Sequence, residues 1–272
     1  MRRVSWAWTL LTAALVTAIL FPLYWAVVAS FTPESRLLAA PSLVPQTVVL
    51  DHYRALFDGR DFWTPIRNSL IVAGLTTLLS VTLGAACAYA LARLRFPGKA
   101  ALLAFILAVS MFPQISIVSP LYLLLRWLHL LNTYPGLVLP YLTFAMPLTI
   151  WMLVGFFRDL PAQLEEAAFM DGASRARTLW EVVLPLAAPG LATTAILTFL
   201  YSWNEFLFAL SFALGPERYT VPVAIALFRG QYQVPWGEIL AAAVVATVPV
   251  AALVLVAQRR IVAGLTAGAV KG

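Results

Sequence analysis

Residues 158–191 read RDLPAQLEEAAFMDGASRARTLWEVVLPLAAPGL, and the rest of the chain is organised around them. This stretch is the longest polar interruption in the second half of a chain that is otherwise rich in apolar runs. Pro161 is compatible with the first turn of a helix, and the Glu and Ala residues after it favour helix. Asp171-Gly172 predicts a sharp turn, and Ser174 can cap a second helix. The stretch therefore predicts two short helices joined by a turn, placed between two apolar segments.

The composition of the chain indicates an integral membrane protein. Of its 272 residues, 62% are hydrophobic and only 11% are charged, and the mean hydropathy is +0.88. Average soluble domains carry roughly a quarter charged residues. The formal net charge of +6 could suit nucleic acid, but the Arg residues cluster beside apolar runs. That arrangement favours the phospholipid of the inner leaflet, so we expect a lipid bilayer and no nucleic acid as partner.

Six apolar stretches are long enough to cross a bilayer as helices, which takes about 20 residues. These predicted spans are 8–30, 69–91, 100–125, 134–157, 190–211 and 239–257. Prolines inside the third and fourth spans predict bent helices there. The first apolar run is longer than a signal-peptide core of roughly 7–15 residues, which predicts a retained span. We therefore expect an all-α, polytopic membrane protein with a single transmembrane domain over 1–272 and a helix-turn-helix loop at 158–188.

The distribution of Lys and Arg predicts the orientation of these spans. The side richer in basic residues holds 11 of the 18 Lys and Arg residues. They are Arg2, Arg3, Arg93, Arg95, Lys99, Arg158, Arg175, Arg177, Arg259, Arg260 and Lys271. Because six is an even number, both termini lie on that side, which we expect to be the cytoplasm. The loop 158–188 is then cytoplasmic as well.

Residue type alone leaves two interpretations of the loop open. One is an amphipathic segment that lies on the lipid headgroups. The other is a segment that docks into a partner, because Ala167 and Ala168 permit close approach and the adjacent Glu165 and Glu166 offer charges to Arg or Lys.

The motifs of the loop are similar to the EAA loop of ABC importer permeases. The resemblance rests on Glu166-Ala167-Ala168, Asp171-Gly172-Ala173 and Leu184-Pro185 with Pro189 beyond, and residues 201–206 and 258–272 resemble the same family. It is closest to the carbohydrate-uptake (maltose and multiple-sugar) type. In that family the loop is the coupling helix that docks into the ATPase. The resemblance therefore implies an ATPase-coupling role for Glu165, Glu166, Ala167, Ala168, Asp171, Gly172, Leu184 and Pro185.

The resemblance also implies the rest of the transport system. The expected partners are a second homologous permease subunit, a cytoplasmic ABC ATPase dimer, an extracytoplasmic solute-binding protein and a sugar substrate. The expected location is the cytoplasmic (inner) membrane of a bacterium or archaeon. The mechanism that it implies is alternating access, in which ATP binding on the partner moves the loop and the spans open toward the binding protein.

Trp203, Asn204 and Glu205 stand out in the fifth predicted span. An ionisable residue inside an apolar run is a candidate functional residue, because burying it unpaired in lipid is costly. Amide and indole groups also suit sugar binding, so the three residues are candidates for the substrate path. The alternatives are that Asn204 and Glu205 brace helices through hydrogen bonds or lie near the outer surface.

The motifs that are missing limit the function classes. No G-x-x-x-x-G-K-[ST] phosphate loop and no G-x-S-x-G motif occurs. We therefore expect no catalytic residues, no metal site and no cofactor of its own, with ATP and Mg bound by the partner ATPase. Two alternatives stay open beside the sugar importer. They are a secondary carrier or channel that works without an ATPase, with Glu205 as its ion-coupling group, and the same ABC machinery carrying a glycerol phosphate or polyol.

Overall fold

The structure is a computed structural model that describes residues 6–37, 43–228 and 234–267. Over these residues the chain is helical and has no strand, which confirms the predicted all-α class. Arg2, Arg3, Arg229 and Lys271 of the predicted charge pattern lie outside the described residues, as do the side chains of Arg259 and Arg260. The predicted tail after Arg260 begins as helix, and its last residues, 268–272, lie outside the described part.

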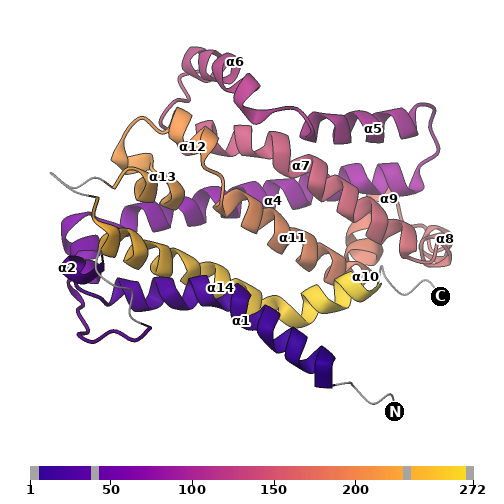
Figure 1. Cartoon of the computed structure of the whole chain (residues 1–272). Helices are drawn as coiled ribbons and strands as arrows, with labels where there is room; N and C mark the ends of the chain where they lie inside the picture. The colour runs from indigo at the N-terminus through magenta and orange to yellow at the C-terminus, as the bar shows by residue number, and fades with distance from the viewer. Residues whose placement is uncertain (1–5, 38–42, 229–233, 268–272) are drawn as a thin grey trace. The chain divides into compact units, whose positions relative to one another are not determined.

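The elements follow one another along the chain as Figure 1 shows. They are α1 (Trp6–Ser30), α2 (Glu34–Leu37), α3 (Asp51–Arg54), the π-helical η1 (Ala55–Gly59), α4 (Trp63–Arg93), α5 (Lys99–Ser110), α6 (Gln114–Trp127), α7 (Tyr134–Asp159), α8 (Gln163–Met170), α9 (Arg175–Thr178), the π-helical η2 (Leu179–Val183), α10 (Leu184–Leu186), α11 (Ala188–Trp203), α12 (Leu207–Phe212), the 3₁₀ turn η3 (Pro216–Arg218), α13 (Val221–Ala226) and α14 (Trp236–Ala267).

Long apolar helices dominate the described chain. Four of its helices, α1, α4, α7 and the first part of α14, are long and apolar enough to cross a membrane. Up to six spans result if each of two bent helix pairs counts as one. The predicted spans 8–30, 69–91 and 134–157 lie within α1, α4 and α7, and 239–257 lies within α14. The polytopic membrane class is therefore confirmed.

The third predicted span, 100–125, is broken rather than merely bent. The helices α5 and α6 meet at an angle of 91°. Pro113 lies at the break in an extended conformation and has no N–H to continue the helix. In α7, by contrast, Pro140 and Pro147 are both accommodated within one continuous helix.

The fifth predicted span, 190–211, needs correction because it is not one helix. Helix α11 ends at Trp203, and α12 starts only at Leu207. The carboxylate of Glu205 accepts hydrogen bonds from the backbone N–H groups of Phe208 and Ala209. This local bonding competes with continuation of the helix. Helix α11 is long and apolar enough for a membrane span only together with the preceding segment Arg175–Leu186. The two segments meet at an angle of 82°.

The chain divides into two compact units, of which the first comprises Met1–Trp63 and Ala224–Pro249. In this unit the start of α14 is held by side chains from the segment that follows α1. Glu34 accepts hydrogen bonds of 2.9 Å from the N–H groups of both Trp236 and Gly237. An acidic group at this position also complements the helix dipole.

The second unit comprises Thr64–Val223 and Val250–Gly272, and α7 packs there against α5 and α11. Gly190 lets α11 approach α7, because a Cβ atom at this position would lie 2.5 Å from the ring of Phe156. The hydroxyl groups of Thr149 in α7 and Thr198 in α11 form a hydrogen bond of 2.9 Å. Small residues and hydroxyl pairs are the usual contacts between helices in membranes.

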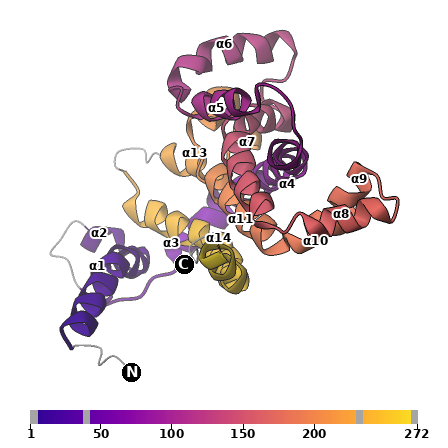
Figure 2. The same ribbon diagram turned by 90° about the vertical axis from the view of Figure 1, so that its right-hand side faces the viewer.

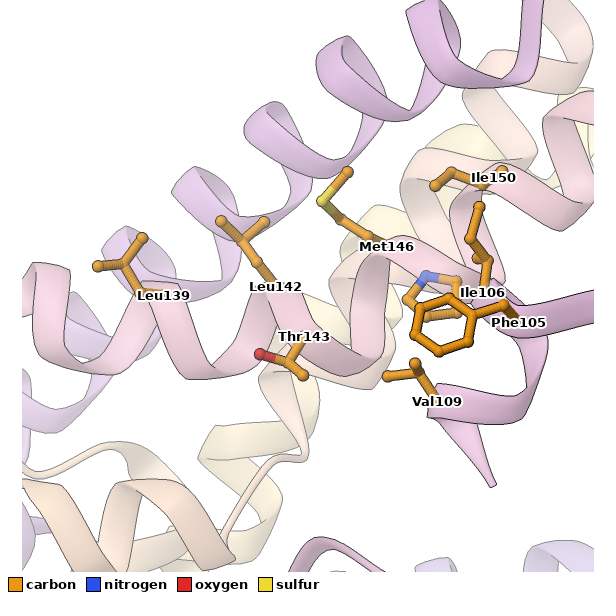
Figure 3. A pocket seen from close by; sticks show the side chains of 9 residues that line it. Phe105, Ile106, Val109, Leu139, Leu142, Thr143, Met146 and Ile150 are labelled. Atoms are coloured by element: carbon orange, nitrogen blue, oxygen red, sulfur yellow. The ribbon is translucent and has the colours of Figure 1, made fainter. Parts of the chain in front are cut away.

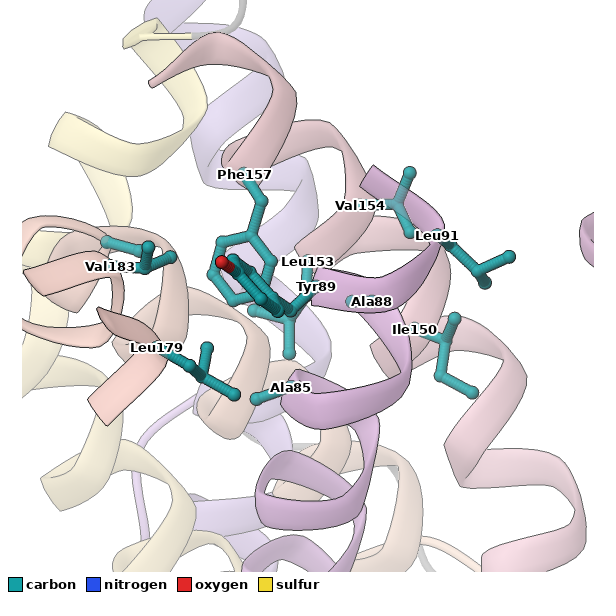
Figure 4. Close-up of a cluster of buried hydrophobic side chains, with 11 residues drawn as sticks. Ala85, Ala88, Tyr89, Leu91, Ile150, Leu153, Val154, Phe157, Leu179 and Val183 are labelled. Carbon is teal, nitrogen blue, oxygen red and sulfur yellow. The ribbon is translucent and has the colours of Figure 1, made fainter. Parts of the chain in front are cut away.

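Helices α8, α9 and α10 lie at one end of α4, α7 and α11 (Figure 1), and Figure 2 shows them standing to one side of these helices. Beneath them a cluster of buried apolar side chains joins α4, α7 and η2 (Figure 4). Its members are Ala85, Ala88, Tyr89, Leu91, Ile150, Leu153, Val154, Phe157, Leu179, Val183 and Ala187. The second half of the predicted loop is therefore packed into the helical body.

An apolar pocket of about 380 Å³ lies between α5 and α7 (Figure 3). Phe105 and Val109 contribute from α5, and Leu142, Met146 and Ile150 contribute from α7. The proline-containing third and fourth predicted spans thus line a common space, and none of the described residues that line it is charged.

Polar side chains hold the segment between α12 and α13 at the opposite end of α4 and α7. The Asn132 side-chain oxygen accepts hydrogen bonds from the N–H groups of Leu214 and Gly215, at 3.0 and 3.3 Å. The amide of Asn68, at the start of α4, donates to the backbone oxygen of Glu217 at 3.0 Å. These bonds fix the course of the segment that follows α12, at the end of the fifth predicted span.

Candidate functional site

The predicted helix-turn-helix of the loop 158–188 is present. Helix α8 is followed by a turn at Asp171-Gly172, where Gly172 has a φ of +83°. This left-handed conformation favours glycine. The Ser174 hydroxyl accepts a hydrogen bond of 3.3 Å from the N–H of Arg177 and so caps α9. The second arm then runs from α9 through η2 to α10.

Most of the predicted coupling residues lie on an exposed surface of α8 and its turn. Glu166, Ala167, Asp171 and Gly172 are exposed, and Ala168 is half-buried. Large apolar side chains lie beside them, with Met170 87% exposed. Exposed acidic groups next to small and apolar residues form a surface suited to a protein partner.

Glu165 differs from its neighbour because it is buried, with only 6% of the residue exposed. Its carboxylate forms an ion pair of 2.5 Å with Nε of Arg93, at the end of α4. The Tyr89 hydroxyl donates to the same carboxylate at 3.1 Å. The guanidinium of Arg93 also donates to the backbone oxygen of Leu160 at 2.8 Å. The Glu165 side chain therefore makes intramolecular contacts, which connect α8 to α4.

The last two predicted coupling residues begin α10. Leu184 is half-buried and packs against the apolar cluster of Figure 4, whereas Pro185 is exposed. Proline is accepted in the first turn of a helix because its missing N–H would have no partner there. These two residues connect the second arm of the loop to α11.

The predicted substrate-path residues occupy the break between α11 and α12, and they face different surroundings. Trp203 is buried and stacks on Phe199, with ring centroids 5.7 Å apart. Asn204 is exposed, and its amide donates to the backbone oxygen of Leu200. Glu205 is 7% exposed and bonds the N-terminus of α12, so the structure does not bring the three side chains together on one surface.

Sequence reasoning missed the polar residues that surround this break. Tyr141 of α7 is fully buried near Glu205, and its hydroxyl makes no hydrogen bond to any of the described residues. Gln114, the first residue of α6, donates a hydrogen bond of 2.7 Å to the hydroxyl of Tyr201. The signal available in the sequence was polar residues inside apolar runs, namely Gln114 after Pro113 and Tyr141 after Pro140.

The described residues contain no group of three or more His, Cys, Asp or Glu side chains that could hold a metal ion. The fold and the exposed helix-turn-helix define a class of protein: a polytopic α-helical membrane component with a loop that exposes acidic, small and apolar side chains. Residues 80–266 match the family described as binding-protein-dependent transport system inner membrane component. The chain belongs to this family of transport permease components.

Several relatives match nearly the whole chain. The trehalose transport system permease protein SugB of Mycobacterium tuberculosis is 48% identical over 267 residues, 97% of each chain. The trehalose/maltose transport system permease protein MalG of Thermococcus litoralis is 42% identical, over 97% of this chain and 96% of the relative.

Solved structures support the fold. The chain is similar to a chain of a bacterial ABC transporter that imports the acidic polysaccharide alginate, with a TM-score of 0.78 and 23% identity. The match covers 95% of this chain and 98% of that chain. A chain of a bacterial alginate ABC transporter in complex with an alginate pentasaccharide-bound periplasmic protein gives a TM-score of 0.67 at 18% identity.

Proposed function

We propose that this chain is the transmembrane permease subunit of an ATP-driven, binding-protein-dependent sugar importer, working by alternating access with a second permease subunit, a cytoplasmic ATPase dimer and an external binding protein. The relatives at 48% and 42% identity are named as permeases for trehalose and for trehalose and maltose. Membership of the binding-protein-dependent family favours this function over a secondary carrier or a channel.

The observation that carries the proposal is the exposed surface of α8 and its turn. Glu166 and Asp171 supply charge there, and Ala167 permits close approach. The ATPase would dock on this surface and supply ATP and Mg, so the chain itself acts without catalytic residues. In such a system the two ATPase states must differ in affinity for ATP, because a ligand shifts an equilibrium only by its differential affinity.

The proposed orientation places α8 and both termini in the cytoplasm, and the charge distribution along the chain supports it. Arg93 and Lys99, two of the basic residues expected there, lie at the α8 end of the second unit. Positive residues are retained on the cytoplasmic side. A cysteine at position 167, in a Cys87→Ala background, should react with an impermeant maleimide only from the cytoplasmic face.

The experiment that tests the function is reconstitution of the chain with its co-purified partners into vesicles. We expect accumulation of radiolabelled trehalose or maltose that requires both ATP and the binding protein. Glu166→Lys should lose the ATPase from the purified complex and stop uptake. The matched control is Asp58→Lys, the same charge reversal at an exposed residue between the first two predicted spans, on the side of the membrane opposite α8 in the proposed orientation. Uptake by the isolated chain without ATP would contradict the proposal.

One observation favours the alternative that the same ABC machinery carries a polyol-type solute. The sulfoquinovosyl glycerol transport system permease protein SmoH of Agrobacterium fabrum is 42% identical over 254 residues, 93% of this chain. The uptake assay should therefore include a glycerol glycoside beside the disaccharides. Faster uptake of the glycoside would reassign the substrate while leaving the ATP-driven mechanism in place.

A further inference from the structure

The contacts of Arg93 and Glu165 join three elements of the second unit. Arg93 and Tyr89 belong to α4, Leu160 follows α7, and Glu165 belongs to α8. We call these four residues the α4–α8 joint. Each carboxylate oxygen of Glu165 has its own donor, since Arg93 bonds Oε1 and Tyr89 bonds Oε2. The guanidinium uses a second N–H for the Leu160 oxygen, so the joint constrains both the position and the rotation of α8.

Burial makes this ion pair different from the exposed pair of Arg177 and Glu181 on the same loop. The side chains of Arg93 and Glu165 are 16% and 8% exposed. Those of Arg177 and Glu181 are 65% and 59% exposed. Separating a buried, hydrogen-bonded pair leaves an uncompensated charge, whereas an exposed pair is screened by water and contributes little. The α4–α8 joint therefore restrains the loop, and the exposed pair does not.

The second arm of the loop is attached to the same helices by apolar contacts. Leu179 and Val183 of η2 are buried in the cluster that includes Ala88 of α4 and Phe157 of α7 (Figure 4). Polar contacts thus attach α8, and apolar contacts attach η2. A loop held at both arms moves together with the ends of α4 and α7.

We propose that Arg93 and Glu165 are positioning residues that keep α8 rigidly attached to α4, so that a displacement of α8 reaches the transmembrane helix instead of being absorbed by the loop. This inference rests on the proposed function, in which the ATPase docks on α8. It separates two adjacent acidic residues, because Glu166 contacts the partner and Glu165 transmits the movement within the chain.

The test measures the distance between α4 and α8 in the complete transporter. Spin labels are placed on the exposed positions Ala86 of α4 and Gln163 of α8, in a Cys87→Ala background. We expect one narrow distance distribution that is the same without nucleotide and with ATP. Glu165→Gln should broaden it, lower the trehalose imported per ATP hydrolysed by at least about fivefold, and leave the ATPase bound. The matched control Glu181→Gln should change none of these.

A charge-swap variant distinguishes a specific role of the Arg93–Glu165 pair from a general effect on folding. The double variant Arg93→Glu with Glu165→Arg should restore the narrow distance and the import ratio that either single variant loses. If Glu165→Gln does not reach the membrane, Tyr89→Phe removes one hydrogen bond of the joint and should broaden the distance to a smaller extent.

Two results would overturn the inference. One is an α4–α8 distance that changes when ATP is added to the transporter that carries the unmodified joint. The other is a normal import ratio in Glu165→Gln. If instead the ATPase never co-purifies with the chain that carries the native joint, the proposed function fails. If the ATPase stays bound and Glu165→Gln imports normally, the proposed function remains and only the role proposed for the joint is refuted.

Discussion

The side-chain amide of Asn132 donates a hydrogen bond to the carboxylate of Glu217, which joins the turn before α7 to the segment after α12. This hydrogen bond lowers the pKa of Glu217, because it favours the charged carboxylate. The folded-state pKa then lies below the unfolded value of about 4.3. The stabilisation is present above the unfolded pKa and is lost as the pH falls through the lowered folded pKa.

We therefore predict that removal of the Asn132 amide raises the pKa of Glu217 toward its ordinary value. Asn132 has a φ of +59°, so Asn132→Gly removes the amide without straining the backbone. The measurement is a carbon-13 NMR titration of the Glu-labelled chain in nanodiscs. Asn204→Ala, which removes an exposed amide elsewhere, is the control. An unchanged Glu217 titration in Asn132→Gly would show that the hydrogen bond does not set the pKa.

The turn between α8 and α9 predicts a contrast between two substitutions of Gly172. A Cβ atom there would meet nothing within 4 Å, so only the left-handed backbone opposes a side chain. Gly172→Val should cost about 1–2 kcal/mol and reduce sugar uptake by displacing α8 from α9. Gly172→Asn should retain most uptake, because Asn tolerates this conformation. Initial uptake rates in vesicles measure the contrast, and equal rates for both variants would refute it.

The contact between α7 and α11 predicts that two glycines, Gly190 of α11 and Gly155 of α7, respond differently to replacement by alanine. Gly190→Ala places a methyl group 2.5 Å from the ring of Phe156, and such overpacking costs about 1–3 kcal/mol. Gly155→Ala meets nothing within 4 Å and should be tolerated. Thermal unfolding of the purified variants in detergent measures the difference. A melting temperature of Gly190→Ala equal to that of the unmodified chain would contradict the close packing.

The hydrogen bonds that Glu205 accepts from α12 predict that this residue caps the helix and stabilises the fold. Glu205→Ala leaves two N–H groups of α12 without their acceptor, which costs about 1–3 kcal/mol for a buried group. Glu205→Gln keeps one acceptor oxygen and should destabilise less. Thermal unfolding ranks the variants, with the exposed Asn204→Ala as control.

Transport kinetics of the same variants separate capping from substrate contact. We expect Glu205→Gln to import trehalose with an unchanged KM, because its carboxylate bonds α12. A raised KM at an unchanged melting temperature would instead place Glu205 in the substrate path. Loss of stability in Glu205→Gln equal to that in Glu205→Ala would argue against the capping interpretation.

Local chemistry made the loop 158–188 predictable. The turn depends on Asp171-Gly172 and the cap on Ser174, and both act within a few residues of themselves. Hydropathy located four single-helix spans for a similar reason, because bilayer thickness sets the length of an apolar run. It could not find the break after Trp203, because a window average does not register that Glu205 bonds the backbone of the next helix.

The membrane class, the approximate spans and the form of the exposed loop were predictable from the residues alone, since they follow from hydropathy, proline and turn residues. The different surroundings of Glu165 and Glu166, two neighbours of identical type, could be seen only in the folded chain. The packing of α8 against α4 buries Glu165 beside Arg93 and leaves Glu166 in solvent. Arg93 and Glu165 are 72 positions apart, so their partnership depends on a contact between distant helices that neither spacing nor composition encodes.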